Sequence, residues 1–479
     1  MLKKLLVTLA SSSLLIGAAA AAPAHASRSQ ESVFQDDTAL IFSGDGTRQR
    51  TLDQIKSLGG TTIHSLVFWN SIAPDRDSKR KPAGFDGSNP DAYPPGAWDQ
   101  YDALVSEAQA RGLQIIFSPV RAPAWAGRCG GLSIRNHCNP NPREYQAFLT
   151  ALGRRYPTVH RWSFWNEPNQ AGWLQPQQVR KHGRNVPQAA VMYRNLVRAG
   201  IAGLRAAGHG GDQLMIGETA PLGHTTGALS RRSLAPVPFY QAVFCLDSRG
   251  HSVRGRLARD MGCRGRYAKL PIKGITHHPY NRGGSQPPTA RPGSGEITIA
   301  NLSRLSSVIN QGARAHRIPA RLPFYFTEFG FQTNPPDRIF GISLARQARW
   351  INESDYIAWH NSRVRAVAQY EMFDDPQLAA FQTGLRFKNG KAKPSYGAYR
   401  LPIWVTRSGS GVRVWGWVRP AGGSPQTVQI QNGQKKFRTV KTARTDSHGF
   451  FDVRIGRKPG SKWRFLWGKF RSRQAGIGT

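Results

Sequence analysis

The sequence predicts an α/β protein, a (β/α)8 barrel of parallel strands followed by a small all-β sandwich domain. Two observations predict this architecture. From about residue 36 to residue 402, short apolar runs alternate with amphipathic stretches, which is the pattern of repeated β–α units. From residue 403 to about residue 470, apolar and polar residues alternate with period two between Gly, Pro and Asn turns, which is typical of an antiparallel sandwich.

Eight apolar runs are the expected barrel strands. They cover residues 39–42, 63–68, 113–118, 159–164, 214–216, 272–276, 324–326 and 366–370. Eight such runs with helices between them match a TIM barrel with inserted loops. In that architecture the functional groups lie on the loops that follow the C-terminal ends of the strands.

Amphipathic stretches between these runs predict the helices. The clearest cover residues 97–111, 144–156, 186–207, 300–317 and 342–361. The second follows Asn141-Pro142, a favourable helix start because a proline in the first turn loses no intrahelical hydrogen bond. The third is followed by Gly208, a common helix stop.

The predicted sandwich domain is the most basic part of the chain. After residue 402 there are 16 Lys and Arg residues, against two acids, Asp446 and Asp452. Two interpretations stay open: a module that targets cell walls or glycans, and an appendage that stabilises the barrel through ordinary β packing.

Residues 1–26 are predicted to be a secretory signal peptide. Lys3 and Lys4 precede an apolar, small-residue stretch from Leu5 to Ala21, and Ala24-His25-Ala26 fits a cleavage site. The alternative is a retained membrane anchor, which the Ala-rich composition and the cleavage site disfavour. We therefore expect an extracellular or cell-wall-associated protein that is not inserted in a membrane once the signal is removed.

The four cysteines of an exported chain favour two disulfides. We expect the local pairing, Cys129 with Cys138 and Cys245 with Cys263, out of three possible connectivities. Neither pair has the spacing of a zinc knuckle, so no metal site is expected. The pairs follow the third and fifth predicted strands, which would place both on the functional face of the barrel.

The formal net charge of +38 predicts adsorption to anionic polymers such as acidic polysaccharides or wall phosphates. A compositional bias toward Arg explains the excess equally well. Nucleic acid is not an expected partner, because the chain is exported and no recognition motif is present.

Two short motifs carry the candidate chemistry. Trp165-Asn166-Glu167-Pro168-Asn169 and Thr327-Glu328-Phe329-Gly330 each place one carboxylate at the end of a predicted strand. Two carboxylates brought into one cleft by different strands are what glycosidic bond cleavage needs. For a single Glu at a strand end, the alternative is an ion pair with a nearby Arg.

The surroundings of Glu167 suggest how it is held. Pro168 disfavours a helical backbone at the preceding residue, so Glu167 is expected to continue the strand. Burial against aromatic side chains and the field of the second carboxylate would raise the pKa of one of the two Glu residues.

These motifs resemble those of clan A glycoside hydrolases, most closely the secreted glycosidases and endoglycanases of families 39 and 5. Asn166-Glu167-Pro168 resembles the acid/base motif at the end of strand four, and Thr327–Gly330 the nucleophile motif at the end of strand seven. The resemblance covers about residues 36–402. It implies a retaining O-glycosyl hydrolase that acts on a poly- or oligosaccharide without a cofactor.

The resemblance also implies roles for individual residues. Glu167 would be the general acid/base and Glu328 the nucleophile, Asn166 would hold the sugar 2-hydroxyl, and His278 or Tyr280 would orient the nucleophile. Softer candidates for substrate contact are Trp69, Arg121 and Trp125, for which ordinary loop packing is the alternative. The clan often carries a Trp after strand eight, and here Met372 or Phe373 is expected in that place.

Two other functions stay open at this point. A catalytically inactive glycan-binding protein on a barrel scaffold would not need both Glu167 and Glu328. A transglycosylase would need the same residues and differ only in the acceptor.

Overall fold

The computed structural model describes residues 27, 29–129, 132–265, 267–282, 285–456, 458 and 460–479. The expected signal peptide, residues 1–26, lies outside the described residues. Within them, no helix combines the length and the apolar character that crossing a membrane requires.

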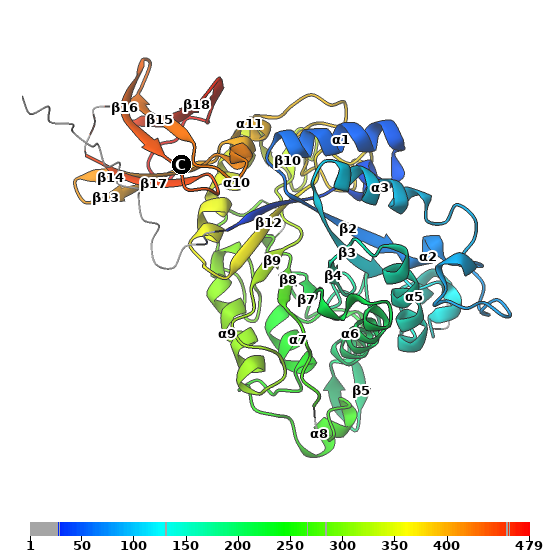
Figure 1. The fold of residues 1–479 in the computed structure, drawn as a ribbon. Coiled ribbons are helices and arrows are strands. Elements are labelled where there is room, and N and C mark those ends of the chain that lie inside the picture. Colours follow the sequence, from blue (N-terminus) through cyan, green and yellow to red (C-terminus); the bar gives the residue numbers. More distant parts are fainter. Residues whose placement is uncertain are drawn as a thin grey trace, which may run out of the picture.

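Eight parallel strands close into a barrel, as expected (Figure 1). Their order around the barrel is β1-β12-β9-β8-β7-β4-β3-β2, and β1 closes the ring by pairing with both β12 and β2. The strands are β1 (Glu31–Gln35), β2 (Thr62–Phe68), β3 (Gln114–Val120), β4 (Arg161–Ser163), β7 (Gln213–Thr219), β8 (Gly274–His277), β9 (Phe324–Phe326) and β12 (Val364–Tyr370).

The prediction of the first strand is wrong. The barrel strand is β1, whereas residues Thr38–Phe42 form a short helix, η1. Val33 and Phe34 of β1 are fully buried, and Leu40 and Ile41 of η1 are buried as well. A run of four apolar residues can be buried in a strand or in a helix, and its periodicity does not separate the two.

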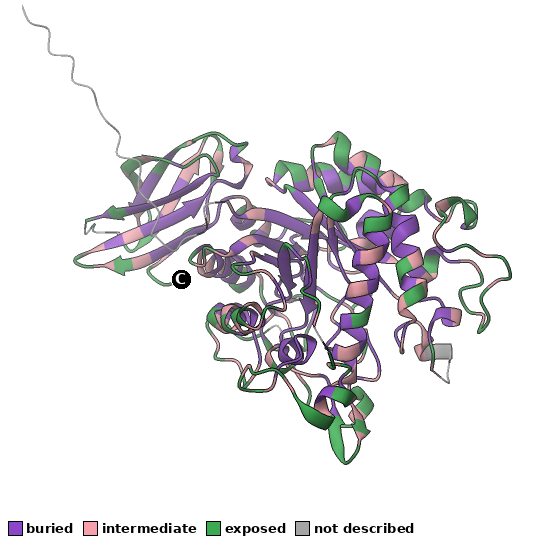
Figure 2. Cartoon of the chain, turned by 60° about the horizontal axis from the view of Figure 1, so that its bottom comes forward, coloured by how far each residue is buried: buried purple, intermediate pink, exposed green. Residues whose placement is uncertain are grey.

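The helices cover the outside of the barrel, with their buried faces turned toward the strands (Figure 2). The five predicted helices correspond to α3, α5, α6, α9 and α10. The helices are α1 (Asp45–Ser57), α2 (Trp69–Ile72), α3 (Asp99–Ala110), α4 (Leu132–Arg135), α5 (Pro142–Arg155), α6 (Gln188–Ala206), α7 (Pro236–Val243), α8 (Gly255–Asp260), α9 (Leu302–Arg314), α10 (Leu344–Trp359) and α11 (Pro394–Arg400).

Short strand pairs occur in the loops. Strands β5 (Val179–Lys181) and β6 (Arg184–Val186) form an antiparallel hairpin between β4 and α6. Strands β10 (Thr333–Asn334) and β11 (Ile342–Ser343) pair between β9 and α10.

The C-terminal part forms the expected β domain from two antiparallel sheets around their own apolar core. The domain limits 36–402 and 403–470 stay predictions, although β1 already begins at Glu31. One sheet has the order β13-β14-β17 and the other β16-β15-β18-β19. The strands are β13 (Ile403–Ser408), β14 (Gly411–Trp417), β15 (Thr427–Gly433), β16 (Phe437–Arg444), β17 (Phe450–Ile455), β18 (Lys462–Trp467) and β19 (Phe470–Arg471).

The tryptophans of β13 and β14 attach this domain to the barrel. Trp404, Trp415 and Trp417 are buried in one cluster with Trp359 of α10. Figure 1 shows the domain, in orange and red, beside α10 and α11. These side chains are used for packing and are not exposed for glycan binding, which favours the stabilising appendage of the two interpretations.

One buried ion pair crosses the same junction. Arg419 follows β14 and donates to Asp355 of α10 at 2.7 Å and to the Ser32 hydroxyl of β1 at 2.9 Å. Its guanidinium also lies 3.7 Å from the ring centre of Tyr399. Both charged side chains are almost fully buried, so each depends on the other for compensation.

Both disulfides have the expected pairing, Cys129–Cys138 and Cys245–Cys263. The first lies in the loop directly after β3, as expected. The second does not lie in the loop after β7, because Cys245 follows helix α7, which comes between the strand and the disulfide. Its expected place on the functional face is therefore wrong.

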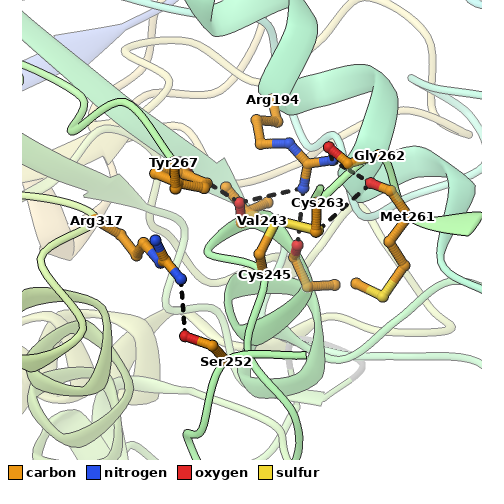
Figure 3. The surroundings of a disulfide bond; sticks show 10 residues. Arg194, Val243, Cys245, Ser252, Met261, Gly262, Cys263, Tyr267 and Arg317 are labelled. Atoms are coloured by element: carbon orange, nitrogen blue, oxygen red, sulfur yellow. Dashed lines mark hydrogen bonds between the residues drawn. A yellow bond between two sulfur atoms is a disulfide. The ribbon is translucent and has the colours of Figure 1, made fainter. Parts of the chain in front are cut away.

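The second disulfide packs against the helical layer instead (Figure 3). Arg194 of α6 donates to the carbonyls of Ala242, Met261 and Gly262, which lie on the two segments joined by Cys245 and Cys263. The disulfide thus stabilises the long connection between α7 and β8.

We predict that Arg419→Ala lowers the free energy of unfolding by about 3–5 kcal/mol, because it leaves the Asp355 carboxylate buried without its partner. The measurement is urea unfolding of the purified protein. Arg155→Ala is the control, since Arg155 and Asp102 are about one-third exposed and such pairs contribute at most about 1 kcal/mol. Equal losses in the two variants would contradict the role of the junction.

Candidate active site

A cleft with a volume of about 480 Å³ opens at the C-terminal ends of the barrel strands. It is lined by residues that end or follow seven of the eight strands, all except β3. Glu167, Glu328, Asn166 and Tyr280 are among these lining residues. The two motifs that sequence analysis singled out therefore meet in one place.

Glu167 enters the cleft from the segment after β4. Its backbone φ is +34°, and that of Trp165 is +64°. The strand ends at Ser163, so the prediction that Glu167 continues it in an extended conformation is wrong. Positive φ in non-glycine residues is unfavourable and has to be held by the surroundings. Trp165 does so: its ring is fully buried and its Nε1 donates to the Trp173 carbonyl at 2.9 Å.

Glu328 enters from the opposite side, two residues after β9. Its side chain is almost fully buried, and the Tyr280 hydroxyl donates to its Oε2 at 3.3 Å. One carboxylate oxygen of Glu167 and one of Glu328 lie within 4.8 Å of each other. The gap between the two carboxylates is therefore short.

The His278 ring lies between the two carboxylates. Its Nδ1 is 3.1 Å from Glu167 Oε1 and 3.5 Å from Glu328 Oε2, and the ring is fully buried. Its Nε2 faces away from the cleft and is 2.8 Å from Oε2 of a third carboxylate, Glu218. One imidazole thus contacts three acids.

Glu218 was not anticipated from the sequence, and a β-bulge places it. The register between β7 and β8 shifts between Ile216 and Thr219, and Gly217 and Glu218 have φ values of +133° and +43°. A Cβ on Gly217 would lie 2.0 Å from the Thr276 carbonyl oxygen, so only glycine fits there. Bulges commonly redirect a side chain beside an active site, and here Glu218 is turned into the barrel.

A layer of polar side chains continues from Glu218 across the inside of the barrel. The Ser118 hydroxyl donates to Glu218 Oε1 at 3.2 Å, and the Thr327 hydroxyl donates to Oε2 at 2.5 Å. His64 lies 2.8 Å from the Ser118 oxygen and 2.6 Å from Gln35 Oε1. All five of these side chains are buried, so the floor of the cleft is a hydrogen-bonded network and not an apolar core.

The charges of this network are set by mutual contacts. Burial alone would raise the pKa of Glu218, but His64 and His278 together with the hydroxyl donors lower it to about 2. Burial alone would lower the pKa of His278, but the carboxylates of Glu328, Glu167 and Glu218 raise it well above its ordinary value. Burial lowers the pKa of His64 to about 4, so this ring is neutral at neutral pH.

A rise in pKa was expected to keep the acid protonated, but the rise is found at Glu328, which the resemblance assigns as the nucleophile. Burial raises its pKa to about 7; His278 opposes the rise, and the charges of Glu167 and Glu218 add to it. The imidazolium and the Tyr280 hydroxyl are the groups that favour its ionised form.

Glu167, His278 and Glu328 also have the composition of a small metal site, because one ligand atom from each lies within 4.8 Å of the others. A metal ion binds a neutral imidazole. Here His278 faces carboxylate oxygens with both nitrogens, so an ion would first have to displace the Nδ1 proton. The absence of a metal stays a prediction.

Asn166 has the properties of a substrate ligand. It lines the cleft with a side chain that is 1 % exposed, and its Oδ1 has no hydrogen-bond partner within the protein. A buried acceptor without a partner is unfavourable, and a ligand hydroxyl in the cleft would satisfy it.

The three softer candidates do not line the cleft. Trp69 is 1 % exposed and stacks on Phe148 at 5.2 Å, so its expected contact with a substrate is wrong. Trp125 packs edge-on against Trp69 at 5.8 Å and donates to the Pro74 carbonyl, and it is a structural residue as well. The Arg121 guanidinium stacks 4.2 Å from the ring centre of Trp173, which lines the cleft.

The aromatic side chain at the end of the eighth strand that lines the cleft is Tyr370, the last residue of β12, and neither Met372 nor Phe373 takes that place. Met372 is fully buried, and Phe373 borders a different cavity. Tyr370 lines the cleft beside Phe381, with ring centres 5.3 Å apart. The strand ends at Tyr370, as predicted, and its last residue, not one that follows it, lines the cleft.

The walls of the cleft differ in character. Phe42, Phe340 and Phe381 are each about half exposed and follow β1, β9 and β12, which are neighbours in the barrel. None of the described residues that line the cleft is Lys or Arg, whereas three of them, Asp37, Glu167 and Glu328, are acidic. The cleft is therefore acidic and partly apolar in a strongly basic protein.

The comparisons with known proteins find a remote likeness only. No family model and no curated protein matches the chain. A family 5 subfamily 18 glycoside hydrolase structure from Streptomyces cattleya, with GlcNAc, matches with a TM-score of 0.49 and 15 % identity over 78 % of this chain and 79 % of that one. A β-glucosidase from Trichoderma harzianum matches with 0.48 and 14 % over 78 % and 96 %.

A family 30 endoxylanase from Clostridium papyrosolvens C71 matches over 94 % of both chains, with a TM-score of 0.44 and 10 % identity. The expected likeness to glycoside hydrolases is thus also seen among solved structures, and family 39 is not specifically supported. At these identities and TM-scores the likeness assigns no activity.

We predict that Gly217→Ala costs about 3 kcal/mol or more of unfolding free energy, since a methyl group there meets the Thr276 carbonyl oxygen in an unfavourable backbone conformation. Gly227→Ala is the matched control. Gly227 also has a positive φ, +86°, but a Cβ there has open space, so its cost should be about 1 kcal/mol. Thermal and urea unfolding measure both, and similar losses would show that the bulge is not constrained.

Proposed function

We propose that the protein is an exported, retaining glycoside hydrolase that cleaves O-glycosidic bonds of a poly- or oligosaccharide. The observation that supports this best is the distance of less than 4.8 Å between carboxylate oxygens of Glu167 and Glu328. Retaining enzymes hold their two carboxyl groups roughly 5–5.5 Å apart, whereas inverting enzymes need roughly 6.5–9.5 Å to admit a water molecule.

In the proposed reaction Glu328 attacks the anomeric carbon while Glu167 protonates the leaving oxygen. A covalent glycosyl-enzyme forms on Glu328. Glu167, now ionised, takes a proton from a water molecule, which attacks the anomeric carbon and releases the sugar with its original configuration. The Tyr280 hydroxyl donates to Glu328, and His278 Nδ1 lies at ion-pair distance from it, 3.5 Å. Both contacts favour the ionised, nucleophilic carboxylate.

The lining of the cleft favours a neutral sugar next to the carboxylates. A uronate or sulfate group there would face the carboxyl groups of Asp37, Glu167 and Glu328 with no Lys or Arg in the described lining to compensate its charge, and it would be repelled by the ionised nucleophile. The exposed phenylalanines on one wall suit the apolar faces of sugar rings. The positive charge of the chain lies outside the cleft, where it would attract an anionic matrix.

Export is part of the proposal. It is supported by the sequence of residues 1–26 and by the two disulfides, which form and persist in oxidising compartments. A transglycosylase remains the second candidate, because it uses the same carboxylates and differs in whether a sugar or water attacks the intermediate.

We predict that Glu328→Ala abolishes hydrolysis of nitrophenyl glycosides, because no nucleophile remains. Added azide should then restore turnover and give a glycosyl azide of inverted configuration. Glu167→Ala should retain the first step for substrates with good leaving groups, because these need no protonation. Hydrolysis at the wild-type rate by both variants would refute the assigned roles.

The product analysis for this experiment also includes an acceptor sugar. A glycosylated acceptor as the main product would identify a transglycosylase. If the wild-type protein binds glycans and cleaves none of them, the protein is a binding protein.

We predict at least about a tenfold higher kcat/KM for neutral glycosides than for the matching uronides, because the like charges of a uronide and the cleft repel each other. The matched pairs are nitrophenyl glucoside with glucuronide and nitrophenyl galactoside with galacturonide. Equal or higher kcat/KM for the uronides would contradict the neutral-sugar assignment.

A further inference from the structure

We propose that Glu218 is a positioning residue that keeps His278 doubly protonated, so that the imidazolium donates its Nδ1–H to Glu167 and places its charge beside Glu328. The catalytic meaning of this inference rests on the proposed function. The protonation of His278 can nevertheless be tested without a substrate.

The geometry at Nε2 requires a proton on that nitrogen. Glu218 Oε2 lies 2.8 Å from Nε2, and the Glu218 side chain is fully buried. An ionised carboxylate only accepts hydrogen bonds, so the contact is favourable only if Nε2 donates. The hydroxyls of Ser118 and Thr327 also donate to Glu218, which favours its ionised form.

The geometry at Nδ1 requires the second proton. Its neighbours are Glu167 Oε1 at 3.1 Å and Glu328 Oε2 at 3.5 Å. A neutral imidazole carries a single proton and would turn a lone pair toward a carboxylate on one side of the ring. While Glu167 and Glu328 are both ionised, only the imidazolium satisfies Glu218 on one side and the two cleft carboxylates on the other.

The remaining titratable groups around this pair do not replace Glu218. His64, from β2, lies 3.6 Å from Glu218 Oε1, but its own nitrogens contact Ser118 and Gln35. His277 is engaged by the Thr219 hydroxyl and the Ile297 carbonyl, and Tyr280 faces Glu328. Among the described residues, Glu218 is thus the one carboxylate that contacts Nε2.

Without the Glu218 charge, His278 would be less basic and would lose its second proton at a lower pH. Glu167 and Glu328 would then lose the cation between them. Their mutual repulsion would disfavour the ionised form of the nucleophile, Glu328. Glu218 does not line the cleft. It contacts the cleft carboxylates through His278, and the Thr327 hydroxyl beside Glu328 also donates to it.

The first test is a pH titration of the protein labelled with ¹⁵N-histidine, followed by NMR. The His278 signals are assigned from their loss in His278→Phe. In the wild-type protein both ring nitrogens should stay protonated through neutral pH. In Glu218→Gln, which keeps the shape of the side chain, the pKa of His278 should fall by at least about one unit, the usual effect of losing an opposite charge in contact.

Asp452→Asn is the matched control, because Asp452 is a buried carboxylate paired with Arg413 at 2.7 Å in the β domain. It should leave the His278 titration unchanged. An unchanged pKa of His278 in Glu218→Gln would overturn the inference. If that variant does not fold, a neutral imidazole in the wild-type protein at pH 7–8 would overturn it equally.

The second test is the pH profile of kcat/KM on a nitrophenyl glycoside. The alkaline limb should move to lower pH in Glu218→Gln and stay in place in Asp452→Asn, since a loss of stability alone does not move it. A wild-type profile in Glu218→Gln would overturn the inference. If the NMR shift occurs but the wild-type protein hydrolyses no glycoside, the proposed function fails while the role of Glu218 at His278 stands.

Discussion

The site depends on one buried imidazolium that contacts three carboxylates. Glu167 and Glu328 can lie within 4.8 Å of each other because His278 separates and partly neutralises them, and Glu218 compensates the same ring from behind. Buried charges of one sign are tolerated only when they are paired and hydrogen-bonded.

The barrel supplies the arrangement through the ends of its strands. The carboxylates follow β4 and β9, His278 follows β8, and the bulge at Gly217 turns Glu218 inward from β7. Because these strands are hydrogen-bonded neighbours or lie across a closed ring, the positions of the four side chains are fixed together. The β domain lies away from the cleft and packs on the barrel, where Arg419 and the tryptophans of β13 and β14 contact α10 and β1.

The periodicity of apolar residues in the sequence predicted the barrel, its later strands and the sandwich, because the spacing of apolar residues follows which side chains are buried. It failed at residues 39–42, where a short apolar run is helical. The two motifs and the resemblance predicted Glu167, Glu328, Asn166 and Tyr280, which line the cleft, and His278, which lies buried beneath its carboxylates. Trp69 and Trp125 pack against other aromatic rings instead, because an aromatic residue near a strand end packs inward as readily as outward. Glu218 and His64 were missed, although a charged or polar residue inside an otherwise apolar strand was a usable signal.

The central claim is that Glu167 and Glu328 act on opposite sides of one sugar ring, with no room for water behind it. The most direct measurement is ¹H NMR of the first-formed anomer during hydrolysis of a glycoside of known configuration. The account predicts that the first product has the configuration of the substrate and that mutarotation produces the other anomer only later. An initial product of inverted configuration would contradict it.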